Sequence, residues 1–179
     1  NRKLKTVYLH DTSRAQAEKL STYITGLDRS IKVVCVNDVK TAIKESDIVV
    51  TCTPSKTPIL HMEDVAPGTF IAAVGCDSED KSEIHPLLIS AAKVVSDFTE
   101  QSAAFGDLHH AIERGLVTKS HVHAELGQII AGQKTGRDND KEVIVFDSTG
   151  TALQDVAAAA MVYERAVLES IGVHFDFQQ

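Results

Sequence analysis

The stretch AAVGCDSEDKSEIH, residues 72–85, joins a short apolar run to a cluster of acidic side chains. The apolar run ends at Gly75, and a glycine after a buried strand allows a flat ligand to approach the backbone closely. Asp77 is the first charged residue beyond it, and a carboxylate at the edge of an apolar cleft can act as a general acid or base. Lys81 could hold Asp77 ionised or contact a ligand oxygen. A hydrated acidic loop explains these residues equally well.

A second stretch, FDSTGTALQD at residues 146–155, runs from a strand through Asp-Ser-Thr-Gly into a long helix. Backbone N–H groups at the start of a helix, flanked by hydroxyls, form a site for a polar or anionic ligand. Ser148 and Thr149 supply the hydroxyls. Either residue could instead serve only as the helix cap.

Two more strand ends carry polar side chains. Asp11 follows the run TVYLH and precedes a helix. In a dinucleotide-binding fold such an acid accepts hydrogen bonds from the adenosine ribose and repels a 2′-phosphate, although helix capping explains it equally well. Thr51 and Thr53 bracket another strand end, where they could touch a cofactor or simply form a turn. The Gly-rich GxGxxG turn of such folds does not occur in the sequence.

Other reactive side chains carry less weight. His121 and His123 could chelate a metal, but no acid or cysteine accompanies them at ligand spacing, so a structural role is favoured. The pair at residues 109–110 is expected on a helix surface, and no metal site is predicted. Cys76 has no feature of an activated nucleophile.

The elements that must position these residues alternate along the chain. Apolar runs predict strands at residues 6–10, 31–36, 47–53, 69–74, 94–98, 142–146 and 173–177. Helices are predicted from residue 13, where Ser13 and Gln16 make a capping box and Gly26 a stop, and at residues 38–46, 85–93 and 151–170, the last capped by Gly172. A mixed region around residues 111–115 and 123–137 is expected to be helical with breaks at its glycines. This alternation predicts an α/β domain with a mainly parallel sheet. In such sheets ligands bind at the carboxyl ends of the strands.

The amino-acid composition and net charge exclude several classes of function. The chain has 179 residues, 43% hydrophobic and 24% charged, as in an ordinary globular protein. Its net charge of −7 argues against nucleic-acid binding. No apolar run approaches the roughly 20 residues of a membrane span, and no secretory leader is visible. Cys35, Cys52 and Cys76 read as free thiols of a reducing compartment, the cytoplasm. The sequence does not begin with Met, so a trimmed or partial chain is expected.

The stretches AAVGCDSEDKSEIH, ELGQIIAGQKTGR and VIVFDSTGTALQDVAAAAMVYERA, in that order, resemble the ornithine cyclodeaminase/mu-crystallin family. That family includes archaeal-type alanine dehydrogenases and reductases of ketimines and cyclic imines. The resemblance, over residues 6–177, implies a partial Rossmann-type NAD(P)-binding domain at residues 1–150. Residues 151–179 are then a long helix and terminal strand that return to a separate substrate-binding and dimerisation domain absent from this chain.

The resemblance also implies that the first strand and its Gly-rich turn are missing here. In the strand order 3-2-1-4-5-6 the first strand is central, so residues 6–10 and 47–53 should have no neighbour between them. Buried backbone groups at that gap would each cost about 1–3 kcal/mol. We therefore expect this excerpt neither to fold stably nor to catalyse alone.

Residue roles follow from the same resemblance. Asp77 resembles the catalytic aspartate and would also contact substrate, while Thr149 corresponds to a substrate contact made by its backbone. Asp11 resembles the ribose-binding acid of the NAD-using members, which favours NAD over NADP. The remaining expected cofactor contacts are Thr53, Ile71, Ala72, Ala73, Val74, Lys81 and Ser148.

The sequence thus predicts an NAD-dependent oxidoreductase or cyclodeaminase acting on the Cα–N bond of a small amino or imino acid, homodimeric when full-length. Of the other acids, Glu79 and Asp80 are expected to face solvent and Glu83 to be structural. The alternative is a non-catalytic NAD(P)H- or ligand-binding protein of the mu-crystallin type. A Rossmann-like methyltransferase is a weaker interpretation, because nothing resembles its cofactor-binding turn.

Overall fold

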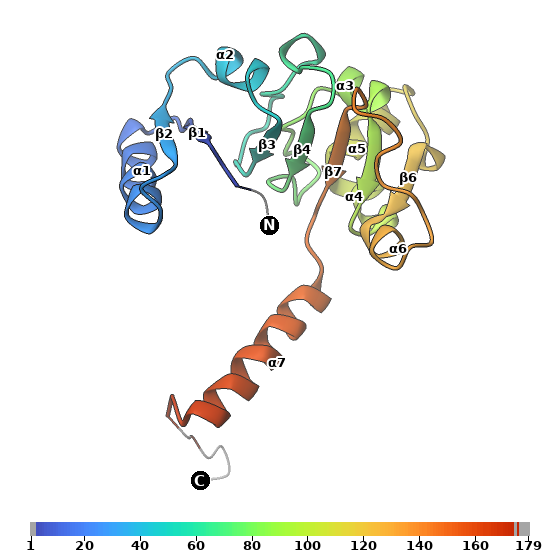
Figure 1. Ribbon diagram of the computed structural model, residues 1–179. Coiled ribbons are helices and arrows are strands. Elements are labelled where there is room, and N and C mark those ends of the chain that lie inside the picture. The colour runs from blue at the N-terminus through green and yellow to red at the C-terminus, as the bar shows by residue number, and fades with distance from the viewer. Residues whose placement is uncertain (1–2, 174, 176–179) are drawn as a thin grey trace.

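Short strands alternate with helices along the chain, as the apolar runs predict (Figure 1). The computed structural model describes residues 3–173 and residue 175. In chain order the elements are β1 (Thr6–Leu9), α1 (Arg14–Leu27), β2 (Lys32–Cys35), α2 (Val39–Lys44), β3 (Ile48–Thr51), the 3-10 turn η1 (Met62–Asp64), β4 (Phe70–Ala73), α3 (Pro86–Ala91), β5 (Lys93–Ser96), α4 (Thr99–Phe105), α5 (Asp107–Glu113), the 3-10 turn η2 (Lys119–His121), β6 (Val122–Glu125), α6 (Leu126–Ile130), β7 (Ile144–Asp147) and α7 (Ala152–Glu169).

The strands form two parallel sheets. The larger sheet has five strands in the order β3-β4-β7-β5-β6, and the smaller consists of β1 and β2. Ala73 of β4 lies opposite Thr51 of β3 on one side and Asp147 of β7 on the other. The carboxyl ends of these three strands are therefore neighbours, and the residues that follow them emerge side by side.

The two sheets are not joined to each other. Within the described residues β1 pairs with β2 and β3 pairs with β4, so β1 and β3 are edge strands. This confirms the expectation that nothing stands between residues 6–10 and 47–53. Val50 and Ile48, which share one face of β3, are 60% and 41% exposed, so this face of β3 is left open by the described residues. In Figure 1, β1, β2 and α1 form a separate lobe beyond β3.

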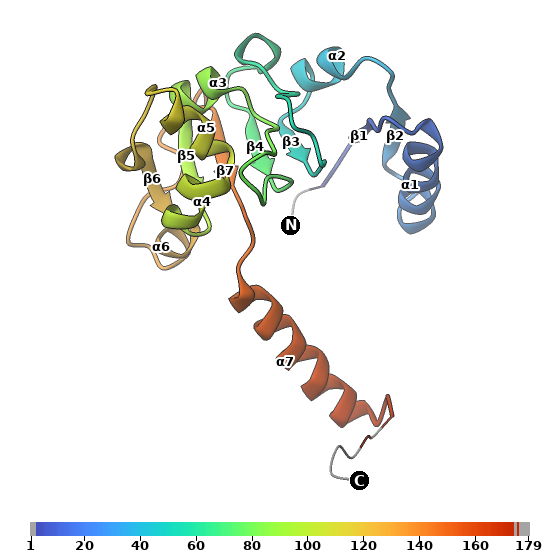
Figure 2. The same cartoon turned by 180° about the vertical axis from the view of Figure 1, so that it is seen from behind.

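The core lies on the five-stranded sheet. Ile71, Val94 and Val145, from three neighbouring strands, are fully buried and pack with Ile89 of α3 and Leu108 of α5. Figure 2 shows α3, α4 and α5 covering one face of this sheet. Burying each such side chain stabilises the fold by about 1.5–3 kcal/mol. This packed half of the molecule therefore holds the strand ends that carry the candidate site.

Several local predictions were wrong. Residues 123–137 were expected to be helical, but Val122–Glu125 forms β6, because pairing with β5 outweighs the helical propensity of the segment. The Ser13 hydroxyl makes no cap hydrogen bond at the start of α1. Gly26 lies inside α1 rather than ending it. The C-cap of α7 is Ser170, in the left-handed conformation with φ 55°, not Gly172.

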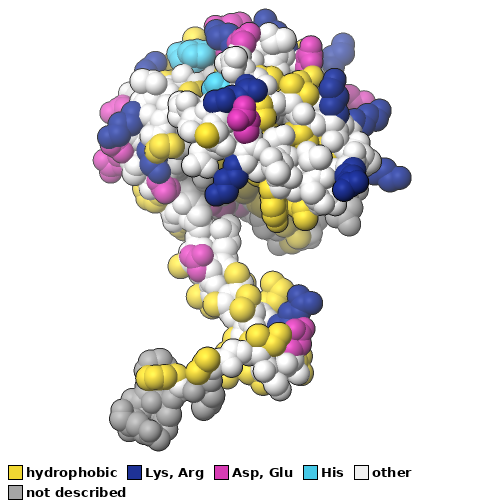
Figure 3. All heavy atoms as spheres, turned by 90° about the vertical axis from the view of Figure 1, so that its left-hand side faces the viewer, with side chains coloured by type: hydrophobic (Ala, Val, Ile, Leu, Met, Phe, Trp, Pro, Cys, Tyr) yellow, Lys and Arg dark blue, Asp and Glu magenta, His cyan; other side chains and the backbone are white. Residues whose placement is uncertain are grey.

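Helix α7 extends away from the sheets (Figure 1). None of its residues is buried. Figure 3 shows hydrophobic side chains along this helix, and its large exposed apolar residues are Leu153, Val156, Met161, Val162, Tyr163, Val167 and Leu168. Among the described residues, no helix is long and apolar enough to span a membrane. The strand expected at 173–177 lies largely outside the described residues.

Candidate functional site

The ends of β3, β4 and β7 bring together most of the predicted site residues. The Ser148 N–H donates to the Ala73 carbonyl at 2.9 Å, and the Val74 N–H donates to the Thr51 carbonyl at 2.9 Å. The segment that leads to Asp77 therefore lies between the threonine-rich end of β3 and the DSTG segment, residues 147–150. The sequence could predict this convergence because parallel strands end at the same edge of a sheet.

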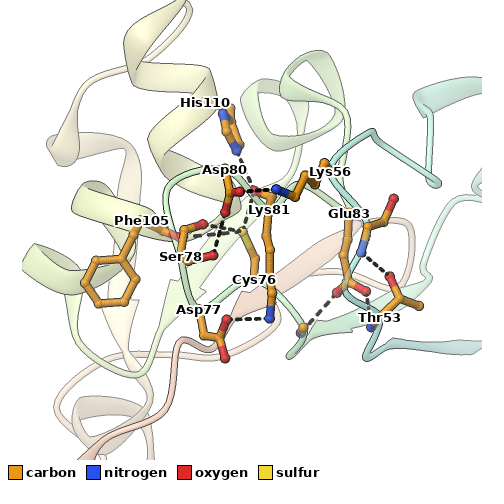
Figure 4. Close-up of polar contacts among 12 residues, drawn as sticks. Thr53, Lys56, Cys76, Asp77, Ser78, Asp80, Lys81, Glu83, Phe105 and His110 are labelled. Carbon is orange, nitrogen blue, oxygen red and sulfur yellow. Dashed lines mark hydrogen bonds and ion pairs between the residues drawn. The ribbon is translucent and has the colours of Figure 1, made fainter.

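Asp77 lies at the rim of a hollow. The hollow measures about 470 Å³ and is lined by Asp77, Ser78, Glu79, Asp80 and Phe105. The Asp77 side chain is 60% exposed, and its Oδ1 is 2.5 Å from the Lys81 Nζ (Figure 4). The hydrogen bond to Asp77 raises the pKa of Lys81, so this lysine stays protonated at neutral pH. Asp77 is thus a solvent-accessible carboxylate with a fixed cationic partner.

Glu83 joins two of the strand ends. Its side chain is fully buried. Oε1 accepts the Thr53 N–H at 2.6 Å and Oε2 accepts the Gly75 N–H at 3.0 Å (Figure 4). Gly75 therefore has a role that the sequence does not indicate. A Cβ at residue 75 would lie 2.6 Å from the Glu83 carboxylate, so the glycine makes room for that side chain.

Two further buried carboxylates lie behind Glu83. Asp107 Oδ1 accepts the N–H groups of Glu83 and Ile84 at 2.8 and 2.9 Å. The Asp147 carboxylate accepts those of Asp107 and Leu108 at 3.2 and 3.0 Å. Burial raises the pKa of Asp107 to about 6, and burial together with the Asp107 charge raises that of Asp147 to about 8. Sequence reasoning did not assign roles to these residues, because buried acids look like ordinary polar residues in a sequence.

Asp97 holds the DSTG segment in place through three hydrogen bonds. Its Oδ2 accepts the Ser148 hydroxyl at 3.1 Å and the Gly150 N–H at 2.8 Å, and its Oδ1 accepts the Thr149 hydroxyl at 3.3 Å. The Gln101 amide donates to the Thr149 hydroxyl at 2.9 Å and to the Gly150 carbonyl at 2.6 Å. Neither Ser148 nor Thr149 caps α7, since the N-cap is Thr151. Asp97 and Gln101 were missed because they lie about 50 residues before the segment they hold.

The predicted cofactor contacts on β4 differ in accessibility. Ile71 and Ala73 are fully buried, Ala72 is half-buried and Val74 is 43% exposed. Thr53 is half-buried, and its hydroxyl accepts the Ser55 N–H at 3.2 Å. Side-chain contact with a ligand from solvent is therefore open to Val74, Thr53 and Ala72, whereas Ile71 and Ala73 are closed to it.

Asp11 lies apart from the other candidates, on the smaller sheet. It follows β1 and is exposed, and its Oδ1 accepts the Ser13 N–H at 2.7 Å at the start of α1. Asp11 is thus an acid that follows a parallel strand, with one carboxylate oxygen used by the Ser13 N–H. The helix-start contact and a ribose contact are compatible, because a carboxylate has two acceptor oxygens.

Other reactive groups near the site are engaged locally. The Cys76 thiol is buried and contacts the Lys81 carbonyl, and burial raises its pKa, so it is not an activated nucleophile. His109, His110 and Glu113 of α5 bring one ligand-type atom each within 4.8 Å of the others. His110 Nε2 contacts the Lys81 carbonyl at 2.6 Å, so this ring buttresses the segment that carries Lys81.

Comparisons with known proteins point to one family. The sequence model of the ornithine cyclodeaminase/mu-crystallin family matches residues 1–170. The chain is 38% identical over 173 residues to an alanine dehydrogenase of Archaeoglobus fulgidus, a match that covers 96% of this chain and 52% of that protein. The chain thus spans about half the length of the curated relatives it matches.

Two solved structures superpose closely on the chain. An archaeal alanine dehydrogenase dimer with bound NAD superposes with a TM-score of 0.88 at 37% identity, covering 97% of this chain and 53% of that one. The Δ1-pyrroline-2-carboxylate reductase of Thermococcus litoralis, in complex with NADH and L-proline, gives a TM-score of 0.91 at 27% identity, with 96% and 53% covered. The parallel α/β architecture is therefore that of these NAD-binding proteins.

Proposed function

Because the chain belongs to the ornithine cyclodeaminase/mu-crystallin family, we propose that the full protein is an NAD-dependent enzyme acting on the Cα–N bond of a small amino or imino acid. The observation that carries the proposal is the ion pair between Asp77 and Lys81, in which Asp77 lines an open hollow, in the segment that follows β4 where β4 and β7 are paired. A relative that oxidises alanine and one solved with NADH and L-proline support this substrate class.

The residues present fit a nicotinamide dinucleotide. Polar groups converge where the parallel strands end, as ligand sites of such sheets do. Thr51 at the end of β3 has a buried hydroxyl without a hydrogen-bond partner among the described residues. Thr53, Val74 and Ser148 would line the cofactor, with Asp11 on the adenosine ribose. NAD, when bound, supplies the hydride chemistry at Cα.

Asp77 would carry out the proton transfer that accompanies the change at the Cα–N bond. Breaking or forming the Cα–N bond requires a base that takes a proton from water or an amine, and an acid that returns it. Asp77 is exposed, so water and substrate can reach it. The Lys81 ammonium lies 2.5 Å from Asp77 Oδ1 and would hold this side chain in place at the site of proton transfer.

The test is Asp77→Asn in the full protein, assayed for NADH formation with amino acids and consumption with imino acids. Asn cannot take up the proton, so turnover should be lost while the Kd for NADH stays within about twofold. Glu79→Gln is the matched control, since Glu79 lines the same hollow and is exposed. A fully active Asp77→Asn variant would remove Asp77 from the mechanism. NADH binding with neither NADH turnover nor ammonia release on any substrate would identify a ligand-binding protein instead.

We assign NAD rather than NADP on the basis of Asp11, whose free carboxylate oxygen would bind ribose hydroxyls and repel a 2′-phosphate. The expected result is that Asp11→Ala weakens NADH binding and brings the NADPH affinity closer to it. Equal affinities for the two dinucleotides in the wild type would contradict the assignment.

Residues 151–179 are proposed to serve a substrate-binding and dimerisation region. The uncovered apolar side chains of α7 support this, because such a surface needs a partner in the full protein. The NAD-bound archaeal relative is a dimer, so sedimentation of the full protein should give twice the mass of one chain. Three free thiols support a cytoplasmic location.

A further inference from the structure

We propose that Glu83 is a positioning residue, which fixes the ends of β3 and β4 relative to each other. Asp107 and Asp147 connect Glu83 to the DSTG segment through further hydrogen bonds. The inference rests on the proposed function, because the positioned segments are those assigned to cofactor and substrate. It goes further because it assigns the relative positions of these segments to three buried side chains that are not themselves assigned to cofactor or substrate.

The Glu83 carboxylate acts as a clamp between two strands. An ionised carboxylate only accepts hydrogen bonds, and both oxygens of Glu83 face backbone N–H donors, Thr53 at 2.6 Å and Gly75 at 3.0 Å. Hydrogen bonds to a charged group are shorter and about twice as strong as neutral ones. Residue 75 stands two positions before Asp77, so the clamp sets where the catalytic segment leaves the sheet.

Backbone hydrogen bonds on both sides of Glu83 hold the residue in place. The Glu83 and Ile84 N–H groups donate to Asp107 Oδ1, and the Glu83 carbonyl accepts the N–H groups of Ile59 and Leu60 at 2.8 and 3.1 Å. These contacts fix the Cα of Glu83 from two sides. The side chain is therefore held rigidly against the two strand ends.

The third carboxylate connects the clamp to β7. Asp147 accepts the N–H groups of Asp107 and Leu108, and its own carbonyl accepts the Ser102 hydroxyl at 3.2 Å. Ser148 follows Asp147 directly. Asp107 thus accepts from the backbone of Glu83, and Asp147 accepts from the backbone of Asp107, in a series that runs from Thr53 to Ser148 through the buried interior.

Two glycines make room for the series. A Cβ at Gly75 would lie 2.6 Å from Glu83 Oε1 and Oε2, and one at Gly106 would lie 2.6 Å from Asp147 Oδ2. Neither glycine has a positive φ, so backbone conformation does not require them. Burying three carboxylates is costly unless each is hydrogen-bonded, and simple packing would be met by apolar side chains. This cost favours a positioning role over a filling role.

The test is Glu83→Gln in the full protein, with the exposed Glu113→Gln of α5 as matched control. Gln keeps the shape but turns an N–H₂ group toward one of the two backbone donors. We expect the Kd for NADH to rise by about tenfold or more and kcat/KM to fall at least as much. Amide hydrogen exchange at residues 53 and 75 should accelerate, whereas the control should match the wild type in all three measurements.

The outcomes separate the two ideas. Unchanged NADH affinity, kcat/KM and amide exchange in a Glu83→Gln variant that merely melts earlier would overturn the positioning role and leave the proposed function intact. A wild type that binds no dinucleotide, together with faster exchange in Glu83→Gln, would overturn the proposed function while supporting the clamp between the strands. If Glu83→Gln does not fold, Gly75→Ala, which displaces the carboxylate without removing it, gives the same readouts.

Discussion

Gly75→Ala tests the close contact between Gly75 and the Glu83 carboxylate. The added Cβ would lie 2.6 Å from Glu83 Cδ, Oε1 and Oε2, whereas non-bonded heavy atoms pack at about 3.5–4.0 Å. The carboxylate must therefore retreat by about 1 Å. That movement breaks the 3.0 Å contact with the residue 75 N–H or the 2.6 Å contact with the Thr53 N–H.

The magnitude follows from these two effects. Overpacking a core costs about 1–3 kcal/mol, and a lost hydrogen bond to a charged group costs about 1.5–3 kcal/mol. Because the two losses arise from one displacement of the same carboxylate, they do not add in full, and we expect Gly75→Ala to lower the free energy of unfolding by about 2–4 kcal/mol. The measurement is urea unfolding followed by circular dichroism, with the slope m checked for constancy.

A double-mutant cycle isolates the contact. In a Glu83→Ala background the carboxylate is gone, so adding Gly75→Ala should cost less than about 1 kcal/mol, which gives a coupling energy of about 2 kcal/mol. Gly26→Ala is the control, since a Cβ there meets nothing within 4 Å inside helix α1, and it should stabilise by up to about 1 kcal/mol. Equal costs of Gly75→Ala in both backgrounds would refute the steric reasoning.

Two further predictions concern buried charge. The folded-state pKa of Asp147, about 8, and that of Asp107, about 6, lie above their unfolded value. Their contribution to the free energy of unfolding is therefore complete below about pH 4 and declines as pH rises, for Asp107 up to about pH 6 and for Asp147 up to about pH 8. Urea titrations from pH 4 to 8 should show the decline, and Asp147→Asn should flatten it above pH 6, while an unchanged slope in that variant would contradict the assignment. The Lys93 side chain is 11% exposed and its Nζ lies 2.8 Å from Glu142 Oε1, so Lys93→Met should lower the free energy of unfolding by about 1–3 kcal/mol. Lys119→Met removes an exposed ion pair and should lower it by less than about 1 kcal/mol. Similar losses in both variants would contradict this ranking.

Much of the fold could be predicted from apolar periodicity. The run at residues 69–74 and the helix at residues 151–170 appear close to their expected bounds, as β4 and α7. Residues 122–125 could not be predicted as a strand, because pairing with β5 decides their conformation and the local sequence does not. Helix α4, at 99–105, was missed for a similar reason, since its seven residues are too few for a clear helical period.

The site was predictable only where it is continuous in sequence. Asp77 and Lys81 stand four residues apart in one loop, so both could be found in a single stretch of sequence, and the structure joins them as an ion pair. The contacts of Asp97 with Ser148 and of Glu83 with Thr53 join residues far apart in the chain. Such contacts depend on the order of strands in the sheet, which single-sequence patterns leave open.

The pairing of Gly75 with Glu83 has an evolutionary consequence. Any side chain at residue 75 collides with the carboxylate, and the loss of the acid leaves two backbone donors unsatisfied. Each single change is therefore deleterious, and a lineage can leave this state only by altering both positions together. Related sequences should accordingly co-vary here, with glycine kept wherever the glutamate is kept.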